Sequence, residues 1–511
     1  MSLPRKDQLA ILFLCRLVDF LQVASLQAYV FYQLKSLDET KSDAQISGQA
    51  GILQGSFTGA QVLTAILWGK AADASWCGRK TVLIVGLFGT AVSCLGYGFA
   101  SSFCWAVFWR AFGGAVNGLV GIIRTMIAEI TVERKYQSRA FLILPMSFNV
   151  AGILGPLLGG YLANPVHTMP YLFAEGGVFA SRLVQQYPFA LPSAINAIFL
   201  TITGTIVYFG LEETLIARRG RFDRGLYIVD RVKQFIFGRP MPTHQGYSQI
   251  GRRDESQDGS VDLEEKSYTV SVSEKPRVLP FNRIWTRNVI LTLVTGAFYD
   301  FHLGAFTNLW TLFLSTPRTL ESLGHISLFF TGGLGMPASM VGGATSILGM
   351  LGMLLQVFLY PPVHARLGTL RSFQWFLFLF PIAYFLAPFL VVLPSSSAAP
   401  EAASGLFVWV GIVLVLFFQV LARTMTLPAS IILLNNCSPH PSVLGTVHGL
   451  GQSVSAGFRT VGPVVGGWWY GAGLDVGMVG ASWWGVTGMS ALGCAAAMFI
   501  YEGSGHELDL D

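Results

Sequence analysis

Charged residues are scarce in this sequence. Asp, Glu, Lys and Arg make up 12% of its 511 residues, whereas soluble domains contain about 25%. Cysteine is also sparse: six are scattered along the chain (Cys15, Cys77, Cys94, Cys104, Cys437 and Cys494), without the spacing of a metal site or a disulfide framework. A Walker phosphate loop and a nucleophile elbow are missing too. We therefore expect neither a soluble domain nor an enzyme, and no metal or cofactor.

Apolar residues take the place of the missing charges: 52% of the chain is hydrophobic and the mean hydropathy is +0.54. A membrane-spanning helix needs about 20 mostly apolar residues, and twelve such segments can be placed. They cover 9–31, 48–69, 81–101, 104–127, 140–163, 189–211, 288–314, 339–361, 371–393, 405–434, 445–470 and 478–501. The apolar segment 326–336 is too short to span and is expected at the interface. The sequence thus predicts an all-α integral membrane protein.

Lys and Arg gather on one side of these spans, which indicates the cytoplasmic side. With the N-terminus inside, the inner side holds Arg5, Lys6, Lys70, Arg79, Lys80, Arg134, Lys135, Arg139, the basic residues of 212–287, Arg366 and Arg371, and the outer loops hold only Lys35, Lys41, Arg182 and Arg318. Both termini are therefore predicted to be cytoplasmic, in the plasma membrane or the vacuolar membrane. The net charge of +5 follows from this asymmetry and gives no reason to expect a nucleic-acid partner.

The chain divides into two sets of six spans, 1–211 and 288–511, separated by a polar cytoplasmic linker, 212–287. Residues 221–237 of the linker place apolar side chains at helical spacing among basic residues, which predicts an amphipathic helix on the inner membrane surface. Residues 246–274 contain few large apolar side chains and are predicted to be disordered. The glycine-rich runs 152–160 and 462–467 recur in the two sets, which indicates a duplicated bundle.

Three short motifs occur in a characteristic order. Trp68-Gly69-Lys70-Ala71-Ala72-Asp73 is followed by Gly78-Arg79-Lys80, with a weaker second copy over 360–371; next come Arg110-Ala111-Phe112-Gly113-Gly114 and the run 152–160. Apart from the linker, the whole chain resembles the major facilitator superfamily in these motifs. One departure concerns the first motif, because its Gly-Arg-Lys stands five residues after the aspartate instead of three.

A narrower resemblance rests on Trp68-Gly69, Arg124-Thr125-Met126-Ile127-Ala128-Glu129 and the stretch 445–467. In these residues the chain resembles fungal members of the twelve-span drug:proton antiporter group, related to the zinc-induced facilitator-like branch. The resemblance implies twelve transmembrane helices in two pseudo-symmetric six-helix bundles around a central cavity, working by alternating access. It also implies a small-molecule substrate, protons and the lipid bilayer as partners, and we expect a monomer.

Charged side chains inside the predicted spans are candidates for function, because burying one in a membrane costs about 2.5–3.5 kcal/mol on insertion scales. Asp19 and Arg16 lie one helical turn apart in the first span. We expect Asp19 to exchange a proton while Arg16, or Arg110 of the second motif, stabilises the empty carboxylate. The alternative is a self-neutralising pair that merely tolerates burial.

The seventh span contains an equivalent carboxylate, Asp300, with Tyr299, His302 and Phe306 on one face. Together with Gln54 these residues are expected to line the substrate cavity, although aromatic faces in membrane helices also serve packing alone. Three further residues, Arg423, His448 and Arg459, are expected near span ends, where snorkelling explains their charge.

The first motif is expected to form a conformational latch between the two halves on the inner side, built from Gly69, Asp73, Gly78, Arg79 and Lys80, and a solvated turn is the alternative. The third motif, typical of antiporters, comprises Gly152, Gly155, Pro156, Gly159 and Gly160. Small residues let two membrane helices approach closely. We therefore expect these glycines to set helix packing rather than to contact substrate.

Taken together, these features predict proton-coupled export of a small organic molecule, such as a drug or secondary metabolite. The sequence is also compatible with two alternatives. One is a transporter of the same fold that carries a metal chelate or a nutrient. The other is a non-transporting membrane sensor, which would need neither buried acid.

Overall fold

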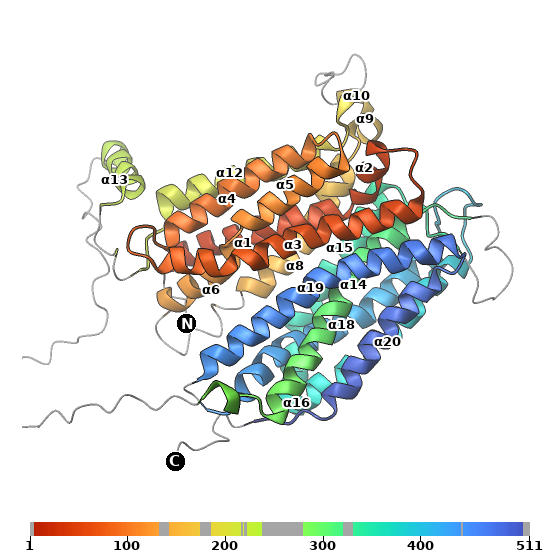
Figure 1. Cartoon of the computed structure of the whole chain (residues 1–511). Coiled ribbons are helices and arrows are strands. Elements are labelled where there is room, and N and C mark those ends of the chain that lie inside the picture. Colours follow the sequence, from red (N-terminus) through yellow and green to blue (C-terminus); the bar gives the residue numbers. More distant parts are fainter. Residues whose placement is uncertain are drawn as a thin grey trace, which may run out of the picture.

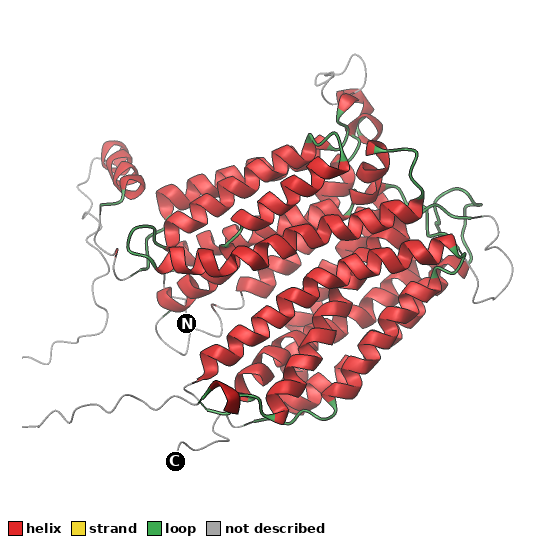
Figure 2. Ribbon diagram, viewed as in Figure 1, coloured by secondary structure: helices red, strands yellow, loops and turns green. Residues whose placement is uncertain are grey.

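In a computed structural model of the chain, the described residues are 5–131, 140, 143–173, 185–215, 218, 222–237, 280–319, 331–440 and 443–503. Their regular structure is helical, apart from one isolated bridge between Arg318 and Gly332 (Figure 2). The first half contains α1 (Lys6–Gln27), α2 (Val30–Leu37), α3 (Asp43–Asp73), α4 (Arg79–Gly98), α5 (Phe103–Val116), α6 (Leu119–Ile130), α8 (Ile143–Leu162), α9 (Pro165–Thr168), α10 (Pro170–Phe173) and α12 (Ala190–Gly210).

The second half begins after the linker helix α13 (Arg224–Phe237) and a short turn, η2 (Phe281–Arg283). It contains α14 (Arg287–Ser315), α15 (Ala338–Leu354), η4 (Leu355–Leu359), α16 (Tyr360–Leu377), α17 (Leu379–Leu386), η5 (Ala387–Val392), α18 (Leu406–Asn436), α19 (Leu444–Asp475) and α20 (Gly480–Ala497). Figure 1 shows these helices as two bundles lying side by side.

Nine helical segments of the described chain are long and apolar enough to cross a membrane. One of them, Ala338–Val392, has 55 residues, or about 80 Å of helix, which is enough for two crossings of a core of about 30 Å. It turns back near Gly368, whose φ of 71° is not helical. Adding α19 and α20 gives the twelve crossings expected from the sequence.

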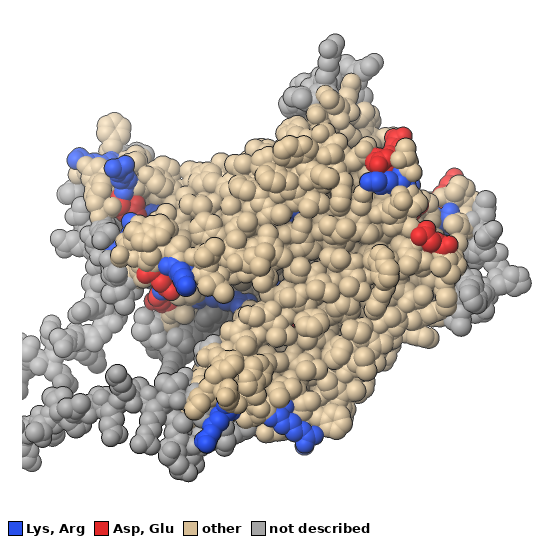
Figure 3. Space-filling model, in the orientation of Figure 1, with Lys and Arg blue, Asp and Glu red and all other residues tan. Residues whose placement is uncertain are grey.

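The surface agrees with a position in the bilayer. On the face shown in Figure 3, charged side chains gather at the two ends of the bundles and the band between them is almost entirely uncharged. The predicted interfacial segment 326–336 falls partly outside the described residues, and its described part, 331–336, is a non-helical loop.

The two bundles pack against each other through two helix pairs, α3 with α19 and α8 with α15. Close approaches of α3 to α19 run from Gly471, beside Ala44, to Gly59, beside Thr460. Nearer the linker the pair separates: Gly457 of α19 has no atom near the position of a Cβ, and Leu67 of α3 is 65% exposed.

We call the end at which α1 begins, α12 ends, α14 begins and α20 ends the linker end. Figure 1 shows α3 and α19 close together at the opposite end and apart at the linker end. The pair α8 and α15 stays in contact further along, where Gly349 lies against Asn149 and Gly152. Directly after α15, Gln356 of η4 accepts a hydrogen bond from Asn149 at 2.7 Å. The space between the bundles therefore widens toward the linker end.

The predicted amphipathic helix of the linker is present as α13, and apolar side chains including Ile228, Val232 and Phe235 are exposed on it. Asp223 caps its first turn by accepting from the amides of Gly225 and Leu226 at 2.9 and 3.2 Å. The predicted disordered segment, 246–274, lies outside the described residues.

Candidate functional site

A buried polar cluster surrounds Asp19 in the first bundle. The Asp19 carboxylate, 5% exposed, forms an ion pair with Arg16 and accepts a hydrogen bond from the Asn117 amide at 2.6 Å. The Arg16 guanidinium also lies 3.7 Å from the centre of the Phe20 ring. Asp19 therefore has two donors that stabilise its ionised form, as expected for a carboxylate kept charged inside a membrane protein.

A break in the fourth crossing brings Asn117 into this cluster. The helix stops at Val116 and restarts at Leu119, and at the break the side-chain oxygen of Asn117 accepts from the Leu119 amide at 3.3 Å. Gln61 of α3 donates to Asn117 at 3.2 Å. Sequence reasoning did not include Asn117, although an Asn-Gly pair inside an apolar segment is a signal of a helix break.

Arg110 occupies a separate place from Asp19. Its guanidinium donates to the Gln22 side chain at 3.2 Å and lies 4.4 Å from the centre of the Phe57 ring. Within the described chain, no acidic side chain lies within ion-pair distance of Arg110. In this conformation the partner of the Asp19 carboxylate is thus Arg16.

Asp300 has its ion-pair partner on another helix. Arg459 of α19 binds the Asp300 carboxylate at 2.9 Å and the Ser455 hydroxyl at 3.1 Å. The sequence placed Arg423 and Arg459 near span ends, and the structure corrects this: Arg459 stands 15 residues inside α19 and Arg423 stands 13 residues inside α18. Snorkelling to the membrane surface does not explain their positions.

The aromatic residues near Asp300 divide between core and cavity. His302 hydrogen-bonds the Tyr384 hydroxyl at 2.9 Å, and the Tyr299 hydroxyl accepts from Thr426 at 3.2 Å. Both Tyr299 and His302 are therefore packed inside the second bundle. Phe306 reaches the cavity wall, and Gln54 lies half-buried on α3.

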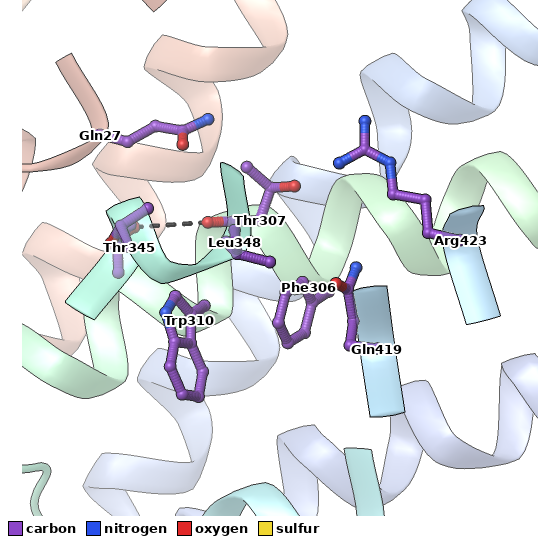
Figure 4. Close-up of a pocket in the computed structure, with 9 residues that line it drawn as sticks. Gln27, Phe306, Thr307, Trp310, Thr345, Leu348, Gln419 and Arg423 are labelled. Atoms are coloured by element: carbon purple, nitrogen blue, oxygen red, sulfur yellow. Dashed lines mark hydrogen bonds between the residues drawn. The ribbon is translucent and has the colours of Figure 1, made fainter. Parts of the chain in front are cut away.

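A pocket lies at this wall between the bundles. It has about 280 Å³ of empty space, part of it open to solvent. Figure 4 shows the residues that line it: Gln27, Phe306, Thr307, Trp310, Thr311, Thr345, Leu348, Gln419 and Arg423. Three buried polar atoms here have no hydrogen-bond partner, the Trp310 indole nitrogen, the Thr345 hydroxyl and the Gln419 carbonyl oxygen. Buried polar groups are normally paired, so this pocket can bind a polar ligand.

The first motif forms a loop held by charged partners at the linker end. Arg79 pairs with Glu129 and with Asp73, the latter at 3.4 Å. The Glu213 carboxylate accepts from the backbone amides of Arg79 and Lys80 at 3.2 and 3.1 Å.

These partners belong to the first bundle and the segment that follows it. Lys80 extends the network by pairing with Asp223 of the linker at 2.6 Å, and burial raises the pKa of the Cys77 thiol above its ordinary value. In the conformation with the linker end open, these contacts of Arg79 and Lys80 are thus all with the first bundle and the segment that follows it. Gly69 lies in the open, with no atom within 4 Å of a Cβ position.

The glycines of the third motif face two different helices. A Cβ added at Gly155 or Gly159 would approach α1, at 2.7 Å from the Ala24 side chain and 2.0 Å from the Ser25 carbonyl oxygen. A Cβ at Gly160 would lie 2.3 Å from the Ala338 carbonyl oxygen, on α15 of the other bundle.

The second glycine run repeats this geometry in α19. Gly462 and Gly466 approach α14 near Phe301 and Ala305, within the same bundle, and Gly467 approaches Ser47 of α3 in the other bundle. Gly155 and Gly159, like Gly462 and Gly466, therefore pack within one bundle. Gly160 and Gly467, the last glycine of each run, pack the two bundles against each other.

Comparison with known proteins decides the family. The profile described as Major Facilitator Superfamily matches residues 10–399, which is more than half of the chain. This chain belongs to the major facilitator superfamily.

Several superfamily relatives are fungal. The chain is 30% identical to "Major facilitator superfamily multidrug transporter mfsB" of Aspergillus fumigatus, over 93% of this chain and 80% of the relative. It is 26% identical to "Efflux pump azaK" of Aspergillus niger, over 90% and 80%. It is also 25% identical to "Protein ZINC INDUCED FACILITATOR-LIKE 1" of Arabidopsis thaliana, over 68% and 62%. The resemblance to fungal and zinc-induced facilitator-like members is confirmed.

Solved structures show the same fold. A D-xylose-proton symporter superimposes with a TM-score of 0.63 at 13% identity, covering 98% of this chain and 99% of the symporter. The major facilitator fold expected from the motifs is therefore confirmed, and the chain is a membrane transporter rather than an enzyme.

Proposed function

We propose that this major facilitator superfamily transporter couples proton movement to the export of a small organic molecule. The observation that carries the proposal is the Asp19 carboxylate, buried with Arg16 and Asn117 as donors. Protonation of Asp19 removes the charge that both donors stabilise. The relative energies of the cavity states then change, and a proton gradient can drive the cycle in one direction.

Export is supported by two observations. The names of the relatives given above include a multidrug transporter and an efflux pump. In addition, the space between the bundles widens toward the linker end, which the distribution of Lys and Arg assigns to the cytoplasm. A cavity open to the cytoplasm is ready to load a cytoplasmic molecule.

We assign the first motif a role in this cycle. Arg79 and Lys80 hold the loop to Glu129 and Asp223 while the linker end is open. Closing that end brings the loop toward the second bundle, so exchange of these ion pairs links loop position to the state of the cavity.

The experiment is transport by purified protein in vesicles with an imposed pH gradient, using a panel of drugs and fungal metabolites. The Asp19→Asn variant is expected to lose gradient-driven accumulation and to keep exchange of substrate for substrate, because the binding cavity stays in place. The Asp300→Asn variant should have a smaller effect on coupling. Asp43→Asn is the matched control, since Asp43 pairs with Lys35 at the opposite end.

Unchanged gradient-driven accumulation by Asp19→Asn, together with an inactive Asp300→Asn, would move proton coupling to the second bundle. Equal loss in Asp43→Asn would show that the assay reports general damage rather than coupling.

A further inference from the structure

Charged residues of the cavity lie in one layer of the membrane. Asp19 stands 13 residues after Lys6, Asp300 stands 13 after Arg287, and Arg423 stands 13 before Asn436, so each is about 20 Å from the linker end of its helix. The two aspartates are already neutralised by arginines, Asp19 by Arg16 and Asp300 by Arg459.

Besides Arg110, Arg423 of this layer has no acidic partner, and neither does Arg124, which stands six residues before the linker end of α6. In the part of the chain that the structure describes, neither Arg423 nor Arg124 lies within ion-pair distance of a carboxylate. Arg459 is close enough to both of them to interact electrostatically. The layer therefore carries an excess of positive charge, and a low-dielectric cavity of one sign attracts a ligand of the opposite sign.

Arg423 stands at the contact between the bundles. Its guanidinium lies 4.0 Å from the centre of the Phe148 ring, which belongs to α8 of the first bundle. The ring is an apolar partner that leaves the donors of the guanidinium free for a second ligand. Arginine presents these donors in a planar fork that matches a carboxylate.

The pocket beside Arg423 supplies both polar and apolar contacts. Figure 4 shows Arg423 and Gln419 on one side and Gln27 and Thr345 on the other, with Phe306 and Trp310 between them. The unpartnered groups of Gln419, Thr345 and Trp310 are all on residues no more than 3% exposed. Such groups stay unpaired only at a cost, which a bound polar molecule removes.

We infer that this pocket selects organic anions: a carboxylate or similar oxyanion pairs with Arg423, and a planar apolar body lies against Phe306 and Trp310. This inference rests on the proposed transport function and adds its substrate class. Arg423 would be the residue that determines the preference for negative charge.

The test is equilibrium binding to the purified full-length protein without a gradient, so it does not depend on proton coupling. Three probes of one shape are compared: 2-naphthoate, the neutral 2-naphthamide and the cationic 2-naphthylmethylammonium. The naphthoate is expected to bind at least about tenfold more tightly than the other two, a difference of about 1.4 kcal/mol.

Arg423→Gln should abolish this preference while leaving binding of the neutral amide within about twofold, because the apolar contacts remain. Arg423→Lys should keep part of the preference for the naphthoate, because lysine keeps the positive charge but lacks the planar fork of donors. Arg283→Gln is the matched control: it removes one positive charge from an exposed residue before α14, outside the cavity.

Equal binding of the three probes by the parent protein overturns the inference, as does preference for the ammonium or absence of binding up to about 1 mM. A preference that survives in folded Arg423→Gln assigns selectivity to another residue and also overturns it. If the parent protein binds the naphthoate preferentially but shows no proton-driven transport in the vesicle assay, the proposed proton coupling is wrong and the anion inference stands.

Discussion

Replacing Gly160 by alanine tests how the two bundles close at the end opposite the linker. The added Cβ would lie 2.3 Å from the Ala338 carbonyl oxygen, and an ordinary contact needs about 1 Å more. Backbone atoms cannot rotate away, so α8 and α15 must separate or the conformation must change. Overpacking of this kind costs about 1–3 kcal/mol. The conformation open at the linker end should therefore lose population by a factor of about 5–150 relative to one in which α8 and α15 are apart.

Gly152→Ala is the matched control, because a Cβ there lies 3.5 Å from the nearest atom, Gly349 Cα, on the same helix pair. The assay is the labelling rate of a cysteine at Leu67, which is 65% exposed while the linker end is open, after Cys104, an exposed native cysteine, is changed to serine. Labelling should slow in Gly160→Ala and stay at the parental rate in Gly152→Ala. Identical rates in all three folded proteins would refute this account of the interface.

Three further predictions concern the loop, the linker and the topology. Gly78→Ala should lower the free energy of unfolding by about 1–3 kcal/mol, because Gly78 has a φ of +80° and a Cβ would lie 2.4 Å from the Glu213 carboxylate; Gly69→Ala, in open space, should not, and equal thermal unfolding of the two would contradict this. Asp223→Asn removes the partner of Lys80, so α13 should become more sensitive to limited proteolysis, and an unchanged cleavage rate would show that this ion pair does not hold the helix. A cysteine at Phe222, 73% exposed, should resist an impermeant thiol reagent on intact cells; rapid labelling there would reject the proposed orientation.

Much of the fold was predictable from the sequence because the bilayer imposes a local rule. Each crossing must be long and apolar enough to span it, so the segments could be placed without knowing their neighbours. The exceptions show where that rule stops. Residues 338–392 form one helical stretch that bends at Gly368. The fourth crossing breaks at Asn117. Both features depend on backbone geometry and local hydrogen bonds, which span length and composition do not specify.

The sequence predicted which charged residues belong to the candidate site better than it predicted which residues they pair with. The Arg16 and Asp19 pair could be anticipated because both lie on one helix, one turn apart. Asp300 was identified as well, whereas its partner Arg459 lies 159 residues away on α19. Nothing in the local pattern distinguishes an arginine that snorkels from one that pairs with an acid on a neighbouring helix.

The sequence by itself determined that this protein lies in a membrane, that its two halves are related, and which motifs it shares with the major facilitator superfamily, because composition, span length and motif order are properties of the linear chain. Only the tertiary structure decided which carboxylate meets which arginine, that Tyr299 and His302 pack inside a bundle, and that Arg423 is left without an acidic partner among the described residues. Those outcomes depend on how helices distant in sequence rotate and cross. The last glycine of each run, Gly160 and Gly467, shows the reason: it allows close contact only with the helix that packing places opposite it.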